Sequence, residues 1–174
     1  MSTHSTPFKV PHRSTRSRHA GEKKLNPSDA LLHEKARVLV TGAGGFIGSA
    51  LVHALNQRGI DQIIVTDRLG EDEKWRNLLP LAFEDYVPAD EFLDGIEEDP
   101  DHFGRFAAVF HLGACSSTTV TDADFVLENN YAYTKDLCRW ALFSGARFVY
   151  ASSAATYGDG ASRSEEHTSE LQSR

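Results

Sequence analysis

The sequence predicts an α/β fold in which helices cover both faces of a doubly wound parallel β-sheet. Apolar runs long enough for buried strands alternate with stretches whose apolar residues recur at helical spacing. Three of these runs end in clusters of small and polar residues. In an open parallel sheet, ligands bind at the edge where the carboxyl ends of the strands meet. The alternation therefore predicts both the architecture and the edge that holds the functional site.

The first strand–helix–strand unit occupies residues 36–67. An apolar strand at 38–40 enters a glycine-rich turn directly, a helix follows that ends near Gly59, and a second strand at 63–66 ends at Asp67. This order of elements is typical of a Rossmann-like nucleotide-binding unit. The apolar stripe expected on the helix consists of Ile47, Leu51, Val52 and Leu55.

The glycine turn has the residues that a dinucleotide pyrophosphate requires. Gly42 allows a tight turn, Gly45 lets backbone N–H groups approach the phosphates, and Gly48 lets the helix pack close to the strand. Asp67 follows nineteen residues after Gly48, where such a unit places the group that contacts the adenosine ribose. The alternatives are an ordinary loop and a turn-capping aspartate. The surrounding elements favour nucleotide binding.

Two further strands end in polar clusters. A buried strand at 107–110 precedes the segment 111–119, and a strand at 148–150 precedes the segment 151–158. Between them we expect one long helix, with Thr121 and Asp124 at capping-box spacing and Gly145 at its end. Val126, Tyr133, Leu137 and Ala141 would share one face of it. The strand at 85–88 is short and contains proline. Right-handed crossovers would bring four residues to one edge of the sheet: Gly45, Asp67, Gly113 and Ser153.

The two ends of the chain differ from its middle. Residues 1–35 are basic, rich in Ser and Thr, and predicted to be a disordered extension. The alternatives are an over-long gene start, a transit peptide and a nucleic-acid arm. Residues 36–162 form the expected domain, and residues 163–174 have the composition of a non-native, adapter-like tail. The net charge of −7 argues against nucleic-acid binding, and no apolar run suits a membrane span. The two cysteines and scattered histidines indicate a cytoplasmic protein without a metal site.

Four motifs carry a family resemblance. The segments 41–48, 111–119, 128–131 and 151–158 together resemble the extended short-chain dehydrogenase/reductases, within the NAD-dependent epimerase/dehydratase family. The glycine turn is shared across that superfamily, whereas the stretches around Cys115 and Ser153 are most similar to heptose epimerases. The resemblance covers residues 37–158. It implies a partial Rossmann-like fold that stops before the C-terminal strands and the substrate domain.

The resemblance implies a nucleotide-sugar substrate and a tightly held NADP that transiently oxidises and re-reduces a sugar carbon, C6 of an ADP-linked heptose. Ser153 would hydrogen-bond the reacting hydroxyl. NAD stays possible, because Ala89 stands where a second phosphate-binding lysine can occur and Leu112 replaces an acidic residue. The implied cofactor contacts, besides the three glycines, are Phe46, Ile47, Asp67, Arg68, Lys74, Leu112, Gly113, Ala114, Cys115, Ser116 and Asn129.

The general base of the family is a Tyr-x-x-x-Lys pair that follows the serine. Here only Tyr131 and Lys135 have that spacing, and they precede Ser153, so we interpret them as a coincidence. We therefore expect the 174-residue chain to be inactive and a full-length form to be a homo-oligomer. Alternatives are a related nucleotide-sugar dehydratase or reductase and a non-catalytic NADP-sensing module.

Overall fold

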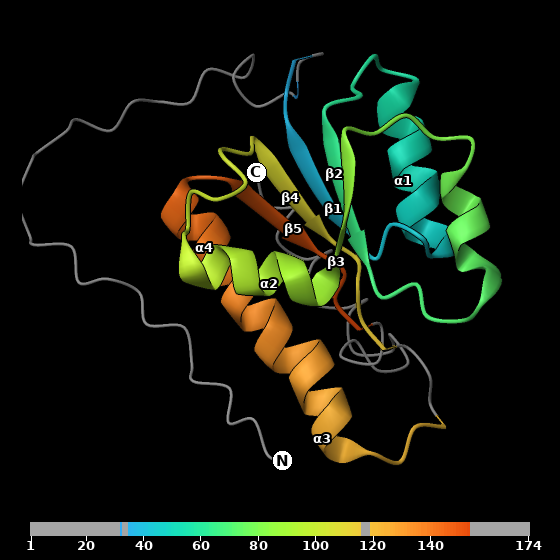
Figure 1. The fold of residues 1–174 in the computed structure, drawn as a ribbon, viewed down its shortest axis with the longest axis vertical. Helices are drawn as coiled ribbons and strands as arrows, with labels where there is room; N and C mark the ends of the chain where they lie inside the picture. The colour runs from blue at the N-terminus through green and yellow to red at the C-terminus, as the bar shows by residue number, and fades with distance from the viewer. Residues whose placement is uncertain (1–31, 33–34, 116–118, 154–174) are drawn as a thin grey trace, which may run out of the picture.

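A five-stranded parallel sheet forms the centre of the molecule, as predicted (Figure 1). The computed structural model describes residue 32 and the ranges 35–115 and 119–153. The spatial order is β3-β2-β1-β4-β5, and every neighbouring pair is parallel. The strands are β1 (Val38–Thr41), β2 (Ile63–Asp67), β3 (Asp85–Pro88), β4 (Ala108–His111) and β5 (Arg147–Tyr150).

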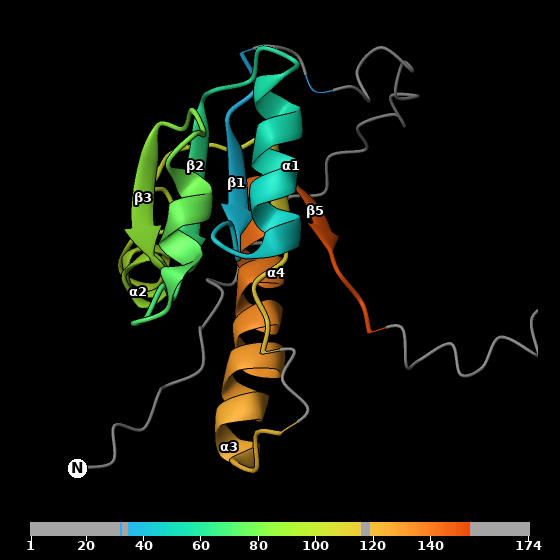
Figure 2. The same cartoon turned by 90° about the vertical axis from the view of Figure 1, so that its right-hand side faces the viewer.

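Helices cover both faces of this sheet (Figures 1 and 2). One face carries α1 (Phe46–Asn56) and the 3₁₀ helix η2 (Glu73–Leu78). The other carries α2 (Ala89–Glu98) and α4 (Tyr133–Ser144). The helix that ends in α4 begins with α3 (Ala123–Val126) and a π-helical segment, η3 (Leu127–Ala132). No helix in the described ranges is both long and apolar enough to cross a membrane.

The two cores follow from the alternation of side chains along the strands. Val38 and Val40 of β1 pack towards α1, whereas Leu39 between them packs towards α2 and α4. All three are fully buried, which is why the strand is a continuous apolar run. On the α2 and α4 face, Trp140 meets Phe92 edge to face, with ring centroids 5.4 Å apart. Such a contact adds about 0.5–1.5 kcal/mol to the burial of the rings.

Five predicted strand boundaries shift by one residue, including the starts of β4 at Ala108 and of β5 at Arg147. The first, second and fourth strands each end one residue later than predicted, at the polar residues Thr41, Asp67 and His111. The strand at 85–88 forms despite Pro88, because β3 lies at the edge of the sheet, where a missing N–H is tolerated. Neither α2 nor η2 was predicted. The acid-rich sequence of α2 contains Gly95 in its interior, which weakens its helical pattern.

The prediction that Ile47 belongs to the apolar stripe of α1 is wrong. Ile47 is 65% exposed, and the face of α1 that packs on the sheet consists of Gly48, Val52 and Leu55. Ile47 lies in the first turn, where the helix extends past the carboxyl end of the sheet. The residue therefore lies outside the core, at the exposed start of α1.

The long helix differs from the prediction at its start. Asp122, and not Thr121, is the N-cap, and its carboxylate accepts a hydrogen bond from the Phe125 amide at 3.0 Å. The helix then passes through η3, whose wider turn shifts the register of everything after it. Its predicted end at Gly145 is confirmed by a left-handed φ of +76°. Tyr133, Leu137 and Ala141 are buried on one face as predicted, whereas Val126 is only half-buried.

Three backbone segments meet at Gly42 without room for a side chain. Gly42 has φ +67°, and a Cβ atom there would lie 2.6 Å from the Gly113 nitrogen. A Cβ on Gly48 would lie 2.1 Å from the Gly42 carbonyl oxygen. The glycine turn therefore brings the start of α1 and the loop after β4 as close to β1 as backbones allow.

Replacing Gly48 with alanine should lower the free energy of unfolding by roughly 1–3 kcal/mol or more, because the new methyl group overlaps the Gly42 carbonyl. Gly45→Ala is the matched control, since its Cβ would meet only the Gly42 oxygen, at 3.3 Å. Urea denaturation of both variants measures the difference. Equal stability of the two would contradict this account of the glycine turn.

Candidate functional site

The strand order of the sheet reverses at β1, so the carboxyl end of β1 is the switch point of the fold. The strands β2 and β3 lie on one side of β1, and the chain then crosses to β4 on the other side. The loops that leave β1 and β4 therefore flank this switch point, where open α/β sheets bind their ligands. Gly42 and Gly113 pack against each other there. We call this space between the loops after β1 and β4 the crevice.

The amino terminus of α1 has features of an anion-binding site. Gly45 is the N-cap with extended backbone angles, and no described side chain caps the helix. Phe46 and Ile47, the first two helical residues, are 87% and 65% exposed. The N–H groups of a first helical turn have no partner within the helix, and the helix dipole favours negative charge at this end. A pyrophosphate fits these residues.

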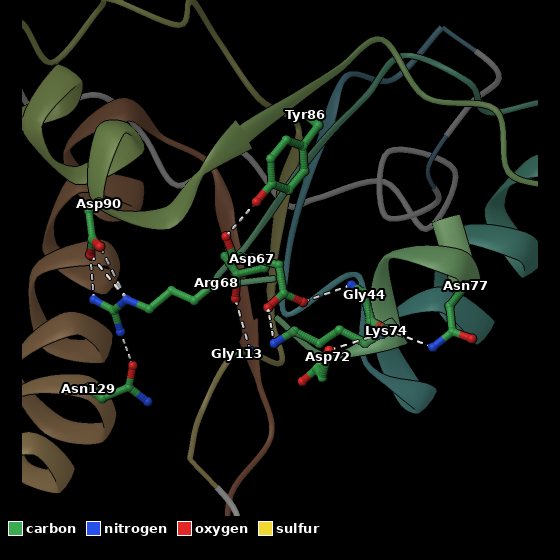
Figure 3. Close-up of polar contacts among 11 residues, drawn as sticks. Gly44, Asp67, Arg68, Asp72, Lys74, Asn77, Tyr86, Asp90, Gly113 and Asn129 are labelled. Atoms are coloured by element: carbon green, nitrogen blue, oxygen red, sulfur yellow. Dashed lines mark hydrogen bonds and ion pairs between the residues drawn. The ribbon is translucent and has the colours of Figure 1, made fainter. Parts of the chain in front are cut away.

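Asp67 at the end of β2 holds the glycine turn in place (Figure 3). Its carboxylate, 9% exposed, accepts hydrogen bonds from the Gly44 amide at 2.8 Å and from Lys74 Nζ at 3.0 Å. Two contacts here were not predicted: Asn77 Nδ2 donates to the Gly44 carbonyl at 2.8 Å, and the Tyr86 hydroxyl donates to the Asp67 carbonyl at 2.9 Å. Of the predicted cofactor contacts, the structure thus brings Asp67 and Lys74 together.

Arg68 points away from that pair (Figure 3). Its guanidinium donates to the Asp90 carboxylate, with Nε 3.1 Å from Oδ1, and to the Asn129 side-chain oxygen. The hydrogen bond to Asp90 raises the pKa of Arg68 further above its usual range. The guanidinium also lies 5.8 Å from the centre of the Tyr133 ring. Arg68 and Asn129 are therefore neighbours, on the opposite side of Asp67 from Lys74.

The loop after β4 is fixed by a residue of the π-helical segment. Asn130 accepts a hydrogen bond from the Cys115 amide at 2.7 Å and donates to the Cys115 carbonyl at 2.9 Å. This pair of contacts explains why an asparagine occurs in mid-helix. Of the predicted cofactor contacts in this loop, Leu112, Gly113 and Cys115 are half-buried and Ala114 is exposed. Ser116 lies outside the described residues.

His111, the last residue of β4, links the end of β1 to α4. Nδ1 lies 2.7 Å from Thr41 Oγ1, and Nε2 lies 2.7 Å from Thr134 Oγ1. Burial lowers the pKa of His111 to about 4, so the ring is neutral at physiological pH. None of these three residues was assigned a role from sequence. One feature of the sequence could have indicated this network, namely the polar residues near the ends of three apolar strands. In the sheet, Thr41 at the end of β1 pairs with both Thr66 and His111.

The remaining predicted residues lie at the same edge of the sheet. Ser153 is exposed, three residues beyond the end of β5. Tyr131 is exposed on η3, and Lys135 Nζ lies 5.1 Å from the centre of its ring. Burial raises the pKa of the neighbouring Tyr133 to about 12, so that phenol stays protonated at neutral pH. In the described part of the chain, no three His, Cys, Asp or Glu side chains are grouped to hold a metal ion.

The fold is of the Rossmann-like class, and comparison with known proteins gives its family. The model of the NAD dependent epimerase/dehydratase family matches residues 38–174. The chain belongs to this family.

Individual relatives confirm the resemblance to heptose epimerases. ADP-L-glycero-D-manno-heptose-6-epimerase of Nitratidesulfovibrio vulgaris (strain DP4) is 52% identical over 122 residues, which are 70% of this chain and 38% of that protein. The chain thus spans less than half the length of this relative.

Two solved structures of related proteins have a fold similar to that of this chain. The Helicobacter pylori enzyme of the same name superposes with a TM-score of 0.59 at 27% identity, over 72% of this chain and 41% of that one. A short-chain dehydrogenase/reductase superfamily protein from Agrobacterium tumefaciens with bound NAD superposes with a TM-score of 0.54 at 32% identity, over 70% and 34% of the two chains.

The buried, neutral state of His111 should make stability depend on pH. Its pKa is about 4 in the folded chain and about 6.5 when unfolded, so below pH 6.5 the unfolded chain takes up a proton that the folded chain does not. The free energy of unfolding should therefore fall as the pH drops from 6.5 to 4, by roughly 3 kcal/mol from this residue.

Denaturation of the wild-type chain and of His111→Gln at several pH values measures that contribution, which the variant lacks. His53→Gln, at an exposed position of α1, is the control and should keep the wild-type pH dependence. A His111→Gln variant with an unchanged pH dependence would contradict the neutral, buried state.

Proposed function

We propose that this chain binds NADP in the crevice and forms the cofactor-binding part of a nucleotide-sugar epimerase that inverts C6 of an ADP-linked heptose. The observation that carries the proposal is the uncapped amino terminus of α1 beside the Asp67–Lys74 pair. The heptose substrate is supported by the names of the relatives. By the same analogy, the complete enzyme would act in the cytoplasm as a homo-oligomer, in the synthesis of lipopolysaccharide heptose.

The cofactor would lie with its pyrophosphate at the start of α1, where the backbone N–H groups of Phe46 and Ile47 donate to phosphate oxygens. Gly42, Gly45 and Gly48 allow this close approach. The Asp67 carboxylate is the acceptor for ribose hydroxyls, and Lys74 is the cation for a 2′-phosphate. The remaining proposed contacts are Arg68, Leu112, Gly113, Ala114, Cys115, Ser116 and Asn129.

The net charge of the chain is negative, so the support for NADP over NAD comes from single cationic side chains near Asp67. Lys74 Nζ lies 3.0 Å from Asp67, and a 2′-phosphate near that carboxylate would share the same ammonium group. Arg68 is held by Asp90 and would have to leave that contact to reach the phosphate. Lys74 is therefore the residue on which the preference for NADP depends most directly.

In the reaction, the nicotinamide group would supply the transient oxidation and re-reduction of the sugar carbon. Ser153 would donate a hydrogen bond to the reacting hydroxyl and keep it oriented while a base takes its proton. The loop 112–115, fixed by Asn130, would form the wall of the crevice next to the nicotinamide. This wall would exclude water from one side of the reacting carbon.

The chain should bind NADP at least about tenfold more tightly than NAD, since a charge-assisted contact with a phosphate is worth roughly 1.5–3 kcal/mol. Isothermal titration with both dinucleotides measures this ratio. Lys74→Ala should remove most of the preference, and Lys135→Ala is the control that keeps it. Tighter binding of NAD, or a Lys74→Ala variant with the full preference, would contradict the assignment.

In a chain extended through the genomic reading frame, Ser153→Ala should slow epimerisation by about 10²–10⁴-fold and leave cofactor affinity nearly unchanged. Tyr131→Phe is the matched comparison and should have a much smaller effect on turnover. The assay follows inversion at C6 of the heptose nucleotide. A larger loss in Tyr131→Phe than in Ser153→Ala would overturn the assignment of Ser153 and the interpretation of Tyr131 as a coincidence.

A further inference from the structure

His111 has no role in the proposed reaction, yet the hydrogen bonds around it specify which ring nitrogen carries the hydrogen. The Thr134 hydroxyl donates its only hydrogen to the Asn130 carbonyl, at 2.7 Å. Towards His111, Thr134 Oγ1 therefore acts as an acceptor. The donor must be Nε2, which lies 2.7 Å away. The ring is thus the neutral tautomer with hydrogen on Nε2.

The hydrogen bonds at Nδ1, on the other side of the ring, independently indicate the same tautomer. Thr41 Oγ1 accepts hydrogen bonds from the Leu112 amide at 3.2 Å and the Gly113 amide at 3.1 Å. These two amides use the acceptor capacity of the oxygen, so its hydrogen is left for His111 Nδ1, at 2.7 Å. A hydrogen on Nδ1 would face an oxygen with no acceptor site left. Both ends of the network require the same tautomer.

This directed network connects the parts that border the crevice. Thr41 directly precedes the glycine turn. The two amides that donate to its hydroxyl, those of Leu112 and Gly113, begin the loop after β4. Thr134 lies in the first turn of α4, two residues after the end of η3. Its partner Asn130 fixes Cys115 of the same loop. The ring is packed between Tyr133 and Phe148, with centroids 5.3 and 6.0 Å away. Its position is therefore fixed by hydrogen bonds and by ring packing.

We propose that His111, as the Nε2–H tautomer, is a positioning residue that sets the spacing between the glycine turn and the segment carrying Asn129 and Asn130. It acts through Thr41 and Thr134 and does not touch the cofactor. A change at Thr134 is transmitted through the ring to Thr41, and so to the backbone of both loops. The proposal rests on the proposed function, because the spacing that it assigns to His111 is that of the cofactor crevice.

The tautomer is measured without any cofactor. Long-range ¹H–¹⁵N NMR spectra at pH 7 distinguish a bare from a protonated ring nitrogen, and the His111 signals among the eight histidines are those missing in His111→Gln. We expect hydrogen on Nε2 and a bare Nδ1. Hydrogen on Nδ1, or on both nitrogens, would overturn the proposal.

The transmission is tested by two substitutions at one position. Thr134→Val removes the hydroxyl at nearly constant volume, and Thr134→Ser keeps it. Among variants that circular dichroism shows to be folded, Thr134→Val should bind NADP at least tenfold more weakly than the wild type, and Thr134→Ser within about threefold of it. The ratio of NADP to NAD affinity should stay the same in both, because the 2′-phosphate contacts lie elsewhere.

Affinity in folded Thr134→Val within twofold of the wild type would overturn the positioning role, since a purely structural threonine would change stability alone. If Thr134→Val does not fold, the proposal is tested by the tautomer in the wild-type chain and by the affinity of Thr134→Ser for NADP. A wild-type chain that binds neither dinucleotide would instead contradict the proposed function, while the tautomer measurement would still stand.

Discussion

The contact of three backbones at Gly42 determines the geometry of the whole carboxyl edge. A Cβ atom on Gly42 would overlap Gly113, and a Cβ atom on Gly48 would overlap the Gly42 carbonyl. Because α1 starts here, its amino terminus faces the same space as the loop after β4. The hydrogen bonds of Thr41 to Leu112 and Gly113 then fix the distance between the two loops. The crevice is a consequence of how closely these backbones approach.

The electrostatics of the crevice are local, in a chain whose net charge is −7. The proposed binding of an anion at the start of α1 would depend on backbone N–H groups and the helix dipole. Each nearby cation is paired with a carboxylate, Lys74 with Asp67 and Arg68 with Asp90. Both pairs lie at the carboxyl end of β2, and the ribose of a bound dinucleotide would compete for them. Under the proposed function, the preference between NADP and NAD would therefore depend on single side chains.

The sequence predicted those features that depend on local pattern, and it missed those that depend on long-range contacts. The unit from β1 to β2, the parallel sheet and the end of α4 at Gly145 follow from apolar periodicity and glycine chemistry. The π-helical turn, the Asp122 cap and the direction of Arg68 do not, because each depends on neighbours far along the chain or on a choice between adjacent residues. His111 is a further example: its partners Thr41 and Thr134 are 70 and 23 residues away.

The central claim is that the crevice between the loops after β1 and β4 binds a nicotinamide dinucleotide with its pyrophosphate at α1. The most direct measurement is a titration of the ¹⁵N-labelled chain with NADP, followed by amide chemical shifts. We expect the amides of Gly45, Phe46 and Ile47 and those of the loop 112–115 to shift together with one dissociation constant. Unchanged shifts at these amides, or changes confined to the shallow hollow of about 620 Å³ beside Arg37 and Glu84 at the opposite edge of the sheet, would contradict the account.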